Sequence, residues 1–369
     1  MLAFQKAAAP AGAQTLAQSF YTCAKVFARE AEQIFYQQWL CVGRSEQIPQ
    51  GGDYLLAQVL AESILLVRDK SGRARAFFNL CRHRGTRLCT EVQGHFPQAI
   101  ACPYHAWSYG LDGSLLAARH MREVEGFDVA DYPLHACALV EWEGFLWVNL
   151  AGDPQPFAAA FAPLLERFTP WKMTDLRLGH RIDYDVRANW KLLFQNYAEC
   201  YHCSLIHPQL VKHSPDQSGC NDLWEGPFLG GYMDINPGGS LTVTGQTTRS
   251  ALPGVQGENR ERVYYYSLFP NVLLSLHPDY VMVHQLWPEA VDRTRVVCSW
   301  FFDPMAMAKP DFDPLDAVEF WDLTNRQDWH VCELTQQGVS SRAYTPGPYA
   351  HQEGLLAAFD REYLRMLGL

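Results

Sequence analysis

The chain has 369 residues, of which 48% are hydrophobic and 19% charged, and this balance is typical of globular domains rather than disordered or fibrous chains. The length predicts two domains. The formal net charge of −10 does not suit a general nucleic-acid binder, which needs a basic surface.

The N-terminal segment MLAFQKAAAPAGAQTL predicts no secretory leader, because it has no long apolar stretch after a basic start. No run of about 18 apolar residues occurs, so we expect no membrane-spanning helix. The cysteines number 11, an odd count in a long chain, which predicts reduced thiols, a few of them ligands, rather than a disulfide framework. We therefore expect a cytoplasmic protein with no membrane or nucleic-acid partner.

The segment that begins at Trp39 predicts a small antiparallel β domain. The stretches YLLAQVL, SILLVRD, ARAFFNL and GFLWVNL are rich in β-branched and aromatic residues and are separated by Gly, Pro and Asp. Asp112-Gly113 predicts a two-residue hairpin turn. The sequence AGDPQP at 151–156 predicts a boundary. We therefore expect one domain over 39–155 and a second formed by 1–38 and 156–369.

Beyond this boundary the sequence predicts a mixture of helices and strands. We expect helices before Trp39 and over 157–168, 190–206, 315–337 and 353–367, and strands over 264–268, 272–276, 281–287 and 295–302. The long helix is expected to have Asp313 as its N-cap, Pro314 at its first position and Gly338 at its C-terminal cap. Segregated strands and helices favour an α+β second domain.

Two short pairs of metal-ligand residues form the strongest motif. Cys81-Arg-His83 is followed, 18 residues later, by Cys102-Pro-Tyr-His105. A Cys₂His₂ set can bind zinc, but zinc fingers usually keep cysteines and histidines in separate pairs. Here each pair mixes one of each, which favours a Rieske centre, where two thiolates hold one iron and two imidazoles hold the other. Trp107 would shield this centre or simply pack in the core.

A second group of candidate ligands lies in the segment NWKLLFQNYAECYHCSLIHP. Glu199 and His202 are three residues apart and would share one face of a helix. His202 and His207 would lie about 140° out of phase on an unbroken helix, so both can bind one metal only if the helix distorts or ends between them. Pro208 disfavours helical geometry at His207, which favours such an ending.

Two imidazoles and a carboxylate make the ligand set of a non-haem Fe(II) oxygenase, with open positions left for O₂ and substrate. Asp328 is the favoured carboxylate because its neighbours on one helix face are apolar, and a carboxylate there is costly unless it is paired or metal-bound. Asp322 and Glu333 compete with it. Cys200 and Cys203 flank His202, but buried cysteines more often pack as small apolar residues than bind metal.

These motifs resemble those of Rieske non-haem iron oxygenases, in their oxygenase (alpha) component. CRHRG, CPYHAW and YGLDG resemble the cluster-binding signature, and NWKLLFQNYAECYHCSLIHP and QDWHVCELTQQGVSSRAYTPGPY resemble the catalytic segments. The resemblance implies an antiparallel β Rieske domain and a helix-grip (START-like) catalytic domain with a central antiparallel sheet. It implies Cys81, His83, Cys102 and His105 as ligands of a [2Fe–2S] cluster, and His202, His207 and Asp328 as ligands of a mononuclear Fe(II).

The resemblance also implies an assembly and an electron source. Glu199 matches the acidic residue that bridges a cluster histidine of one subunit to the iron of its neighbour, and the family usually forms trimers. O₂ would be the co-substrate. A flavin- or ferredoxin-type reductase using NAD(P)H would supply electrons, because this chain has no dinucleotide-binding fingerprint, and its paired glycines 230–231 and 238–239 lack the required context.

The substrate class is predicted from a narrower resemblance. ECYHC and YYYSLFPNVLLSLHPDYVMVHQLWP look most like the branch that oxidises quaternary amines such as glycine betaine, carnitine, stachydrine and choline, often by N-demethylation. A quaternary ammonium binds well over aromatic faces. The predicted pocket residues are Tyr264, Tyr266, Tyr280, His284 and Trp287, with Tyr265 and Phe269 as further aromatic candidates.

Three other readings of the chain stay open at this point. The first is hydroxylation or dihydroxylation of an aromatic ring or aromatic acid. The second is an electron carrier that kept the cluster and lost the mononuclear iron, and the third is a zinc-binding interaction module. Three irons per chain would indicate a catalytic oxygenase, two would indicate a carrier, and a colourless protein would indicate zinc.

Overall fold

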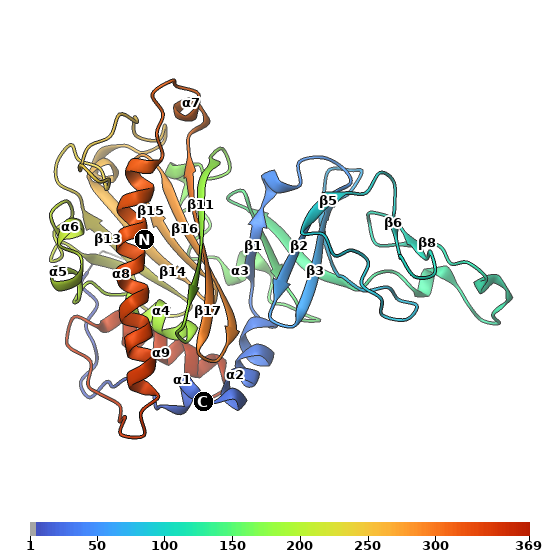
Figure 1. Ribbon diagram of the computed structural model, residues 1–369, viewed down its shortest axis with the longest axis horizontal. Coiled ribbons are helices and arrows are strands. Elements are labelled where there is room, and N and C mark those ends of the chain that lie inside the picture. The colour runs from blue at the N-terminus through green and yellow to red at the C-terminus, as the bar shows by residue number, and fades with distance from the viewer. Residues whose placement is uncertain (1–4) are drawn as a thin grey trace. The chain divides into compact units, whose positions relative to one another are not determined.

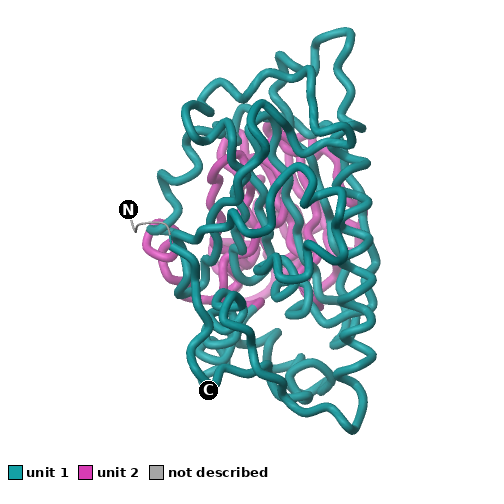
Figure 2. The backbone as a smooth tube through the Cα atoms, turned by 90° about the vertical axis from the view of Figure 1, so that its left-hand side faces the viewer, with its two compact units in different colours: residues 1–34, 161–369 teal, residues 35–160 magenta. Residues whose placement is uncertain are grey.

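Contacts within the chain divide it into two units, Phe35–Ala160 and Met1–Ile34 with Phe161–Leu369, coloured separately in Figure 2. The computed structural model describes residues 5–369. The functional domain limits expected from the sequence, 39–155 and its complement, remain a prediction. Within the described residues, no helix is long and apolar enough to cross a membrane.

The unit Phe35–Ala160 is built on antiparallel strands, as the sequence predicts. Its larger sheet has seven strands in the order β1-β10-β9-β4-β3-β2-β5. These strands are β1 Leu40–Arg44, β2 Asp53–Val59, β3 Glu62–Arg68, β4 Ala74–Phe78, β5 Gln93–His95, β9 Ala136–Trp142 and β10 Phe145–Asn149. A second sheet holds β6 Ile100–Ala101, β7 Ser108–Tyr109 and β8 Leu115–Ala117. Short helical turns lie at Ser45–Gln47, Met121–Glu123, Val129–Asp131 and Phe157–Ala160.

The hairpin between β7 and β8 corrects the predicted turn. The amide of Gly110 donates to the carbonyl of Ser114 (2.8 Å), and the amide of Gly113 donates to the carbonyl of Gly110 (2.9 Å). Three residues rather than two therefore form the loop. Gly113 has a φ of 89°, which a residue without a Cβ adopts at little cost.

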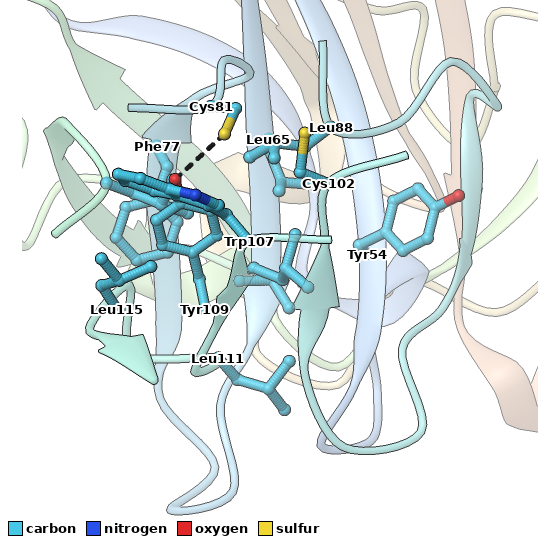
Figure 3. Close-up of a cluster of buried hydrophobic side chains, with 13 residues drawn as sticks. Tyr54, Leu65, Phe77, Cys81, Leu88, Cys102, Trp107, Tyr109, Leu111 and Leu115 are labelled. Carbon is cyan, nitrogen blue, oxygen red and sulfur yellow. Dashed lines mark hydrogen bonds between the residues drawn. The ribbon is translucent and has the colours of Figure 1, made fainter. Parts of the chain in front are cut away.

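An apolar cluster between the ligand-bearing loops and the sheet fixes those loops (Figure 3). Leu65 and Phe77 come from β3 and β4, while Trp107 and Tyr109 come from the chain between β6 and β7 and from β7 itself. All four are buried. Burying such side chains contributes about 1.5–3 kcal/mol each, so the loops that carry them are held to the sheet.

The other unit contains a seven-stranded antiparallel sheet in the order β11-β17-β16-β15-β14-β13-β12. Its strands are β11 Arg177–Val186, β12 Cys220–Leu223, β13 Phe228–Asp234, β14 Arg262–Leu268, β15 Val272–Leu276, β16 Val281–Ala290 and β17 Arg293–Phe302. The last four were predicted from their β-branched and aromatic content. The sheet and its helices confirm the expected α+β fold.

The helices of this unit are α1 Ser19–Thr22, α2 Ala24–Glu30, α4 Trp190–Tyr197, α5 Cys203–Ile206, α6 Pro208–Val211, α7 Pro304–Met307, α8 Leu315–Val339 and α9 Gly354–Met366. Further helical turns lie at Ala31–Phe35, Thr169–Trp171 and Gly257–Glu261. The helix expected over 157–168 is only four residues long, because Pro163 opposes its continuation. The helix expected before Trp39 is confirmed from Ser19 onward, in α1, α2 and the turn Ala31–Phe35. Residues 5–18 are not helical, and residues 1–4 lie outside the described residues.

The long helix α8 matches its predicted start but not its predicted end. The Asp313 carboxylate accepts a hydrogen bond from the amide of Leu315 (2.9 Å), which is the expected capping interaction, although Pro314 is itself the N-cap residue. Gly338 lies inside the helix. Ser340 donates both its amide and its hydroxyl to the carbonyl of Gln336, so the helix continues past the glycine.

Helix α8 crosses one face of the sheet and carries the residues that complete the site (Figure 1). The Trp321 ring lies 6.2 Å from that of Tyr265 on β14, and Asn325 hydrogen-bonds His284 on β16. Helix α4 packs on α8 and is anchored by a buried ion pair between Lys191 Nζ and Glu30 Oε1 (2.5 Å). Helices α4 and α8 therefore bring their facing side chains together.

Candidate active site

The first site lies in two loops of the unit Phe35–Ala160. Cys81 and His83 follow β4, and Cys102 and His105 lie between β6 and β7. The amide of Gly85 donates to the carbonyl of Cys81 (2.9 Å), and the amide of Cys102 donates to the carbonyl of Trp107 (2.8 Å). Each pair is therefore presented by a tight, hydrogen-bonded loop.

The surroundings of the two cysteines are apolar and sparsely hydrogen-bonded. The Tyr109 hydroxyl lies 3.2 Å from Cys81 Sγ and accepts a hydrogen bond from the amide of Arg82 (3.0 Å), as Figure 3 shows for the sulfur contact. Burial and the neighbouring Cys102 raise the pKa of the Cys81 thiol, although the Tyr109 hydroxyl opposes this. A bound cation would reverse that shift and hold the thiolate.

The four donors form one sulfur pair and one imidazole pair. The His83 and His105 rings lie 4.7 Å apart, and His83 stacks on Trp107 at 4.8 Å. His83 Nδ1 is buried and has no hydrogen-bond partner within the described residues, a state that a metal bond would relieve. The pairing of two sulfurs and of two imidazoles fits a two-iron cluster in which each iron takes one kind of ligand.

The second site begins where α4 ends, and here the predicted helix over 190–206 is confirmed at both ends but interrupted at 198–202. Helix α4 stops at Tyr197, and the chain forms turns until α5. Glu199 causes this break, because its carboxylate accepts hydrogen bonds from the amides of Tyr201 and His202. Glu199 and His202 therefore meet through a turn rather than along a helix face, with Oε1 and Nδ1 2.5 Å apart.

Two imidazoles and one carboxylate converge in this second site. The ligand atoms of His202, His207 and Asp328 all lie within 4.8 Å of one another, the one such group found in residues 5–369. Asp328 Oδ1 is 2.8 Å from His207 Nε2 and 3.3 Å from His202 Nε2. His207 follows α5 and Asp328 belongs to α8, so the sheet-facing side of α8 completes the group.

The electrostatics of the second site favour a bound cation. Burial alone would lower the pKa of His202, but hydrogen bonds to Asp328 and Glu199 outweigh it and raise that pKa to about 10. Burial raises the pKa of Asp328, whereas the two histidines lower it more strongly. Two carboxylates thus concentrate negative charge around two imidazoles, and a divalent cation would replace the shared protons.

Sequence reasoning missed the residues that orient His207. The Gln327 Oε1 atom lies 2.8 Å from His207 Nδ1 and also accepts a hydrogen bond from Gln209 Nε2 (2.8 Å). An acceptor at Nδ1 fixes the tautomer that leaves Nε2 free to bind a metal. The contact between His207 and Gln327 joins distant parts of the sequence and leaves no periodic pattern. The only signal in the sequence is that Gln327 directly precedes Asp328.

The two competing carboxylates have other partners. Asp322 accepts from Tyr184 (2.8 Å) and Arg326 (2.9 Å), and Glu333 accepts from the amide of Arg187 (3.0 Å). Neither lies in the group of ligand atoms. Asp328 is therefore the carboxylate that the fold brings to the two histidines.

The cysteines beside His202 depart from the expected reduced state. Cys200 and Cys203 form a disulfide with their Cα atoms 4.9 Å apart, so neither sulfur is a thiolate ligand. The prediction that every cysteine is reduced is wrong for this pair. Outside this pair, the described cysteines form no disulfide. A spacing of three residues at a chain reversal brings the two sulfurs together.

A cavity of about 350 Å³ opens onto the three ligand residues. Its walls come from the turn after α4, from α8 and from β13, β14 and β16. Gly230 and Gly231 form part of the β13 wall, where a Cβ would lie 2.0 Å from the backbone oxygens of Tyr265 and Cys220. The glycines therefore allow β13 to pass close to both neighbouring strands.

The structure corrects the predicted pocket residues. Tyr265 and His284 line the cavity, whereas the remaining candidates do not, namely Tyr264, Tyr266, Phe269, Tyr280 and Trp287. Neighbouring side chains on a strand point to opposite faces, so Tyr265 faces α8 and the tyrosines on either side of it face away. Burial lowers the pKa of His284 to about 4, against a hydrogen bond to Asn325 that raises it, so this ring is neutral.

Tyr280 and Trp287 were predicted to line the pocket but lie elsewhere. The Tyr280 hydroxyl donates to the carbonyl of Leu241 (2.7 Å), and its ring stacks on His277. Trp287 lies on β16 opposite Arg295 of β17, beyond the part of the strand that borders the cavity. The aromatic rings that do line the cavity include Tyr197, Tyr232, Tyr265, Trp321 and Trp329.

Several of these rings stand nearly perpendicular to one another. The Tyr197 and Tyr265 rings are 5.9 Å apart at 85°, and Tyr265 and Trp321 are 6.2 Å apart at 71°. The Tyr265 hydroxyl and the Trp329 indole nitrogen are buried and have no partner in the described part of the chain. The cavity is thus lined by aromatic residues, and two of these residues carry buried hydrogen-bond donors without a described partner.

A second cavity of about 480 Å³ lies on the other side of the Glu199–His202 pair. Tyr344 and Tyr349 from the chain after α8 line it, as does Thr15. Glu199 and His202 line both cavities. The pair therefore separates the ligand cavity from a second opening in the same unit.

Comparison with known proteins identifies the family. Residues 38–133 match the Rieske [2Fe–2S] domain, and residues 173–369 match the ring hydroxylating alpha subunit (catalytic domain). The chain belongs to the ring-hydroxylating Rieske oxygenases. Each match contains one of the two sites described above.

Relatives of this Rieske oxygenase act as oxygenase subunits. It is 32% identical to the glycine betaine monooxygenase oxygenase subunit of Chromohalobacter salexigens, over 92% of this chain and 82% of the relative. It is 37% identical to the carnitine monooxygenase oxygenase subunit of Escherichia coli K12, over 91% and 87%.

Solved structures support the same fold. A quaternary ammonium Rieske monooxygenase aligns with a TM-score of 0.79 at 25% identity, covering 96% of this chain and 94% of that one. Naphthalene 1,2-dioxygenase aligns with a TM-score of 0.76 at 17% identity, covering 99% and 94%, a likeness of fold alone. This Rieske oxygenase therefore uses a [2Fe–2S] cluster, a mononuclear non-haem iron and O₂, and it is an oxidoreductase.

Proposed function

We propose that this Rieske oxygenase oxidises a quaternary ammonium compound such as glycine betaine, with N-demethylation as the outcome. The observation that carries the proposal is the aromatic cavity that opens onto His202, His207 and Asp328. A desolvated cation over aromatic faces gains about 2 kcal/mol or more per favourable contact. The relatives named for glycine betaine and carnitine support the same class.

We assign the metal ligands on the chemistry of the two donor sets. Cys81, Cys102, His83 and His105 would hold the [2Fe–2S] cluster, and the facial set would hold Fe(II). When bound, the two centres supply the electrons and the open coordination positions that O₂ activation needs. The chain's own part is to orient His207 through Gln327, to keep water from the cavity with aromatic rings, and to place the substrate's methyl groups beside the ligands.

Tyr265 and Trp329 would recognise the other end of the substrate. Their hydroxyl and indole N–H are buried donors without partners, and burying such groups unpaired costs about 1–3 kcal/mol each. A carboxylate or hydroxyl oxygen of the substrate would satisfy them. The substrate would thus be held by its charge at the ring faces and by its oxygen at the donors.

Electron entry would use the second opening behind Glu199. This carboxylate bonds His202 and borders both cavities, so it is placed to link the iron ligand to a group that enters from the other side. We propose that this group is a cluster histidine of a neighbouring subunit in a homotrimer. A flavin- or ferredoxin-type reductase using NAD(P)H would reload the cluster in the cytoplasm.

A single turnover tests the substrate class. The reduced protein is exposed to O₂ with a mixed panel of quaternary amines and aromatic acids, and products are read by mass spectrometry with a formaldehyde assay. Formaldehyde together with a demethylated amine is the expected result. A hydroxylated aromatic product with the amines untouched would overturn the proposal and place the chain among arene oxygenases.

A further inference from the structure

The disulfide between Cys200 and Cys203 spans a ligand of the second site. It closes a covalent ring around Tyr201 and His202, directly after Glu199. Both cysteines line the ligand cavity. Cys200 is half-buried and Cys203 is 4% exposed, so the two sulfurs differ in their access to small molecules.

The ring adds a covalent tie to a stretch of backbone that is otherwise held by the Glu199 carboxylate, which accepts from the amides of Tyr201 and His202. Between α4 and α5 the chain is not helical, and the amide of Cys203 reaches the carbonyl of Cys200 at 3.2 Å. From His202 onward the contacts improve, because the amide of Ile206 donates to the carbonyl of His202 and that of His207 donates to the carbonyl of Cys203 (3.0 and 2.9 Å). The disulfide thus ties the first histidine to the turn that presents the second.

We infer that Cys200 and Cys203 are an oxidisable dithiol whose disulfide form retains the mononuclear iron and whose reduced form releases it more readily. The inference rests on the proposed ligand set. Redox-active thiols are accessible and lie beside a resolving cysteine, which is the relation between half-buried Cys200 and buried Cys203. The pair also lies in the cavity where an O₂-dependent oxidation takes place.

Hydrogen peroxide is the oxidant in the proposed step. The Cys200 thiolate attacks one peroxide oxygen, the O–O bond breaks, and the departing hydroxide takes up the thiol proton to become water, leaving a sulfenic acid. The Cys203 thiol then attacks that sulfur, the S–O bond breaks, and a second water leaves as the S–S bond forms. The two sulfurs lose two electrons together, and the peroxide is reduced to two waters. A thiol reductant reverses the change through a mixed disulfide.

The iron should respond because reduction leaves the Glu199 carboxylate as the main tie on this loop. Without the covalent ring, local opening of the loop costs less free energy, and each opening separates His202 from the other ligands. Groups that orient metal ligands typically change metal affinity by about 10–100-fold. We expect iron to leave the reduced holoenzyme about tenfold faster than the oxidised holoenzyme.

The test compares two redox states of one holoenzyme. One sample is treated with a phosphine reductant and the other with one equivalent of hydrogen peroxide, and both are then desalted. Free thiols are alkylated and mapped on the tryptic peptide from Leu192 to Lys212, and iron release to a ferrous chelator is timed. The cluster absorption is recorded in both samples to show that the [2Fe–2S] centre is intact.

After reduction, the Leu192–Lys212 peptide should carry two alkyl labels. After peroxide it should carry none, and its mass should be two hydrogens below that of the unlabelled dithiol peptide. The Cys200→Ser/Cys203→Ser double variant should release iron at the faster rate in both states. Cys220→Ser changes a half-buried, free cysteine on β12 that does not line the cavity, and it should behave as the unaltered protein.

Two results would overturn the inference: alkylation of both thiols after peroxide, or equal rates of iron release in the two states. Asp328→Ala separates this failure from failure of the ligand assignment. If Asp328→Ala holds as much chelatable iron as the unaltered protein, the ligand set itself is wrong. If it holds none while the redox states release iron equally, only the inference about the dithiol fails.

Discussion

Replacing Gln327 with Leu should weaken iron binding without disturbing the fold. The change removes the acceptor 2.8 Å from His207 Nδ1 and leaves that ring without its orienting partner. Loss of such a partner costs about 10–100-fold in metal affinity, or roughly 1.4–2.8 kcal/mol. Leu is similar in size to Gln, so little cavity is created beside His207, which is 1% exposed.

Iron affinity is measured by titrating Fe(II) into protein stripped of mononuclear iron, against a chelator of known strength. Gln327→Glu keeps an acceptor oxygen at the same place and should retain most of the affinity. Arg326→Gln alters the neighbouring position, where the side chain is 63% exposed and bonds Asp322, and it should bind iron normally. Unchanged affinity in Gln327→Leu would show that His207 needs no partner at Nδ1, and the reasoning would be wrong.

Other substitutions probe the remaining parts of the two sites. Asp328→Ala should lose the mononuclear iron and all turnover while the cluster spectrum survives, so iron analysis should fall from three to two per chain; an active variant would rule out this ligand. His83→Ala should abolish electron input and leave the mononuclear iron bound, and loss of both metals would mean that the sites are misassigned. Glu199→Gln should slow electron transfer to the iron by about tenfold or more with both centres present, and rapid-mixing spectra that match the unaltered protein would argue against a link through this carboxylate. Tyr265→Leu should weaken binding of a quaternary amine by about 30-fold, equivalent to roughly 2 kcal/mol, whereas Tyr264→Leu on the opposite face should not; equal calorimetric affinities in the two variants would remove Tyr265 from the site.

Local patterns in the sequence predicted the ligand sets and much of the secondary structure. The mixed Cys/His pairs indicate a Rieske centre by their residue types alone. Strands β14 to β17 carry enough β-branched and aromatic residues to be predicted. Strand β11 was missed because half of its residues are exposed and its sequence has many charged residues, as expected for a strand at the edge of the sheet. Edge strands lack the apolar alternation that marks a half-buried strand.

The end of α4 and the orientation of β14 could not be predicted, because both depend on contacts between residues that no local sequence pattern indicates. The end of α4 could not be predicted because no Pro or Gly marks it. Instead, the Glu199 side chain accepts hydrogen bonds from the amides of Tyr201 and His202, which a continuing helix would use. Which tyrosine of β14 faces the cavity was ambiguous, since Tyr264, Tyr265 and Tyr266 are all aromatic and both faces of the strand are covered. Only the position of α8 decides that the middle tyrosine faces the cavity.

The paired glycines of β13 constrain how this cavity can change during evolution. A side chain at Gly230 or Gly231 would collide with the backbone of β14 or β12, and backbone cannot move aside as a flexible side chain can. The β13 wall is therefore closed to the usual way of narrowing a pocket, which is to enlarge a residue. Adaptation to larger or smaller substrates is left to the other walls, which are α8, the segment after α4, and strands β14 and β16.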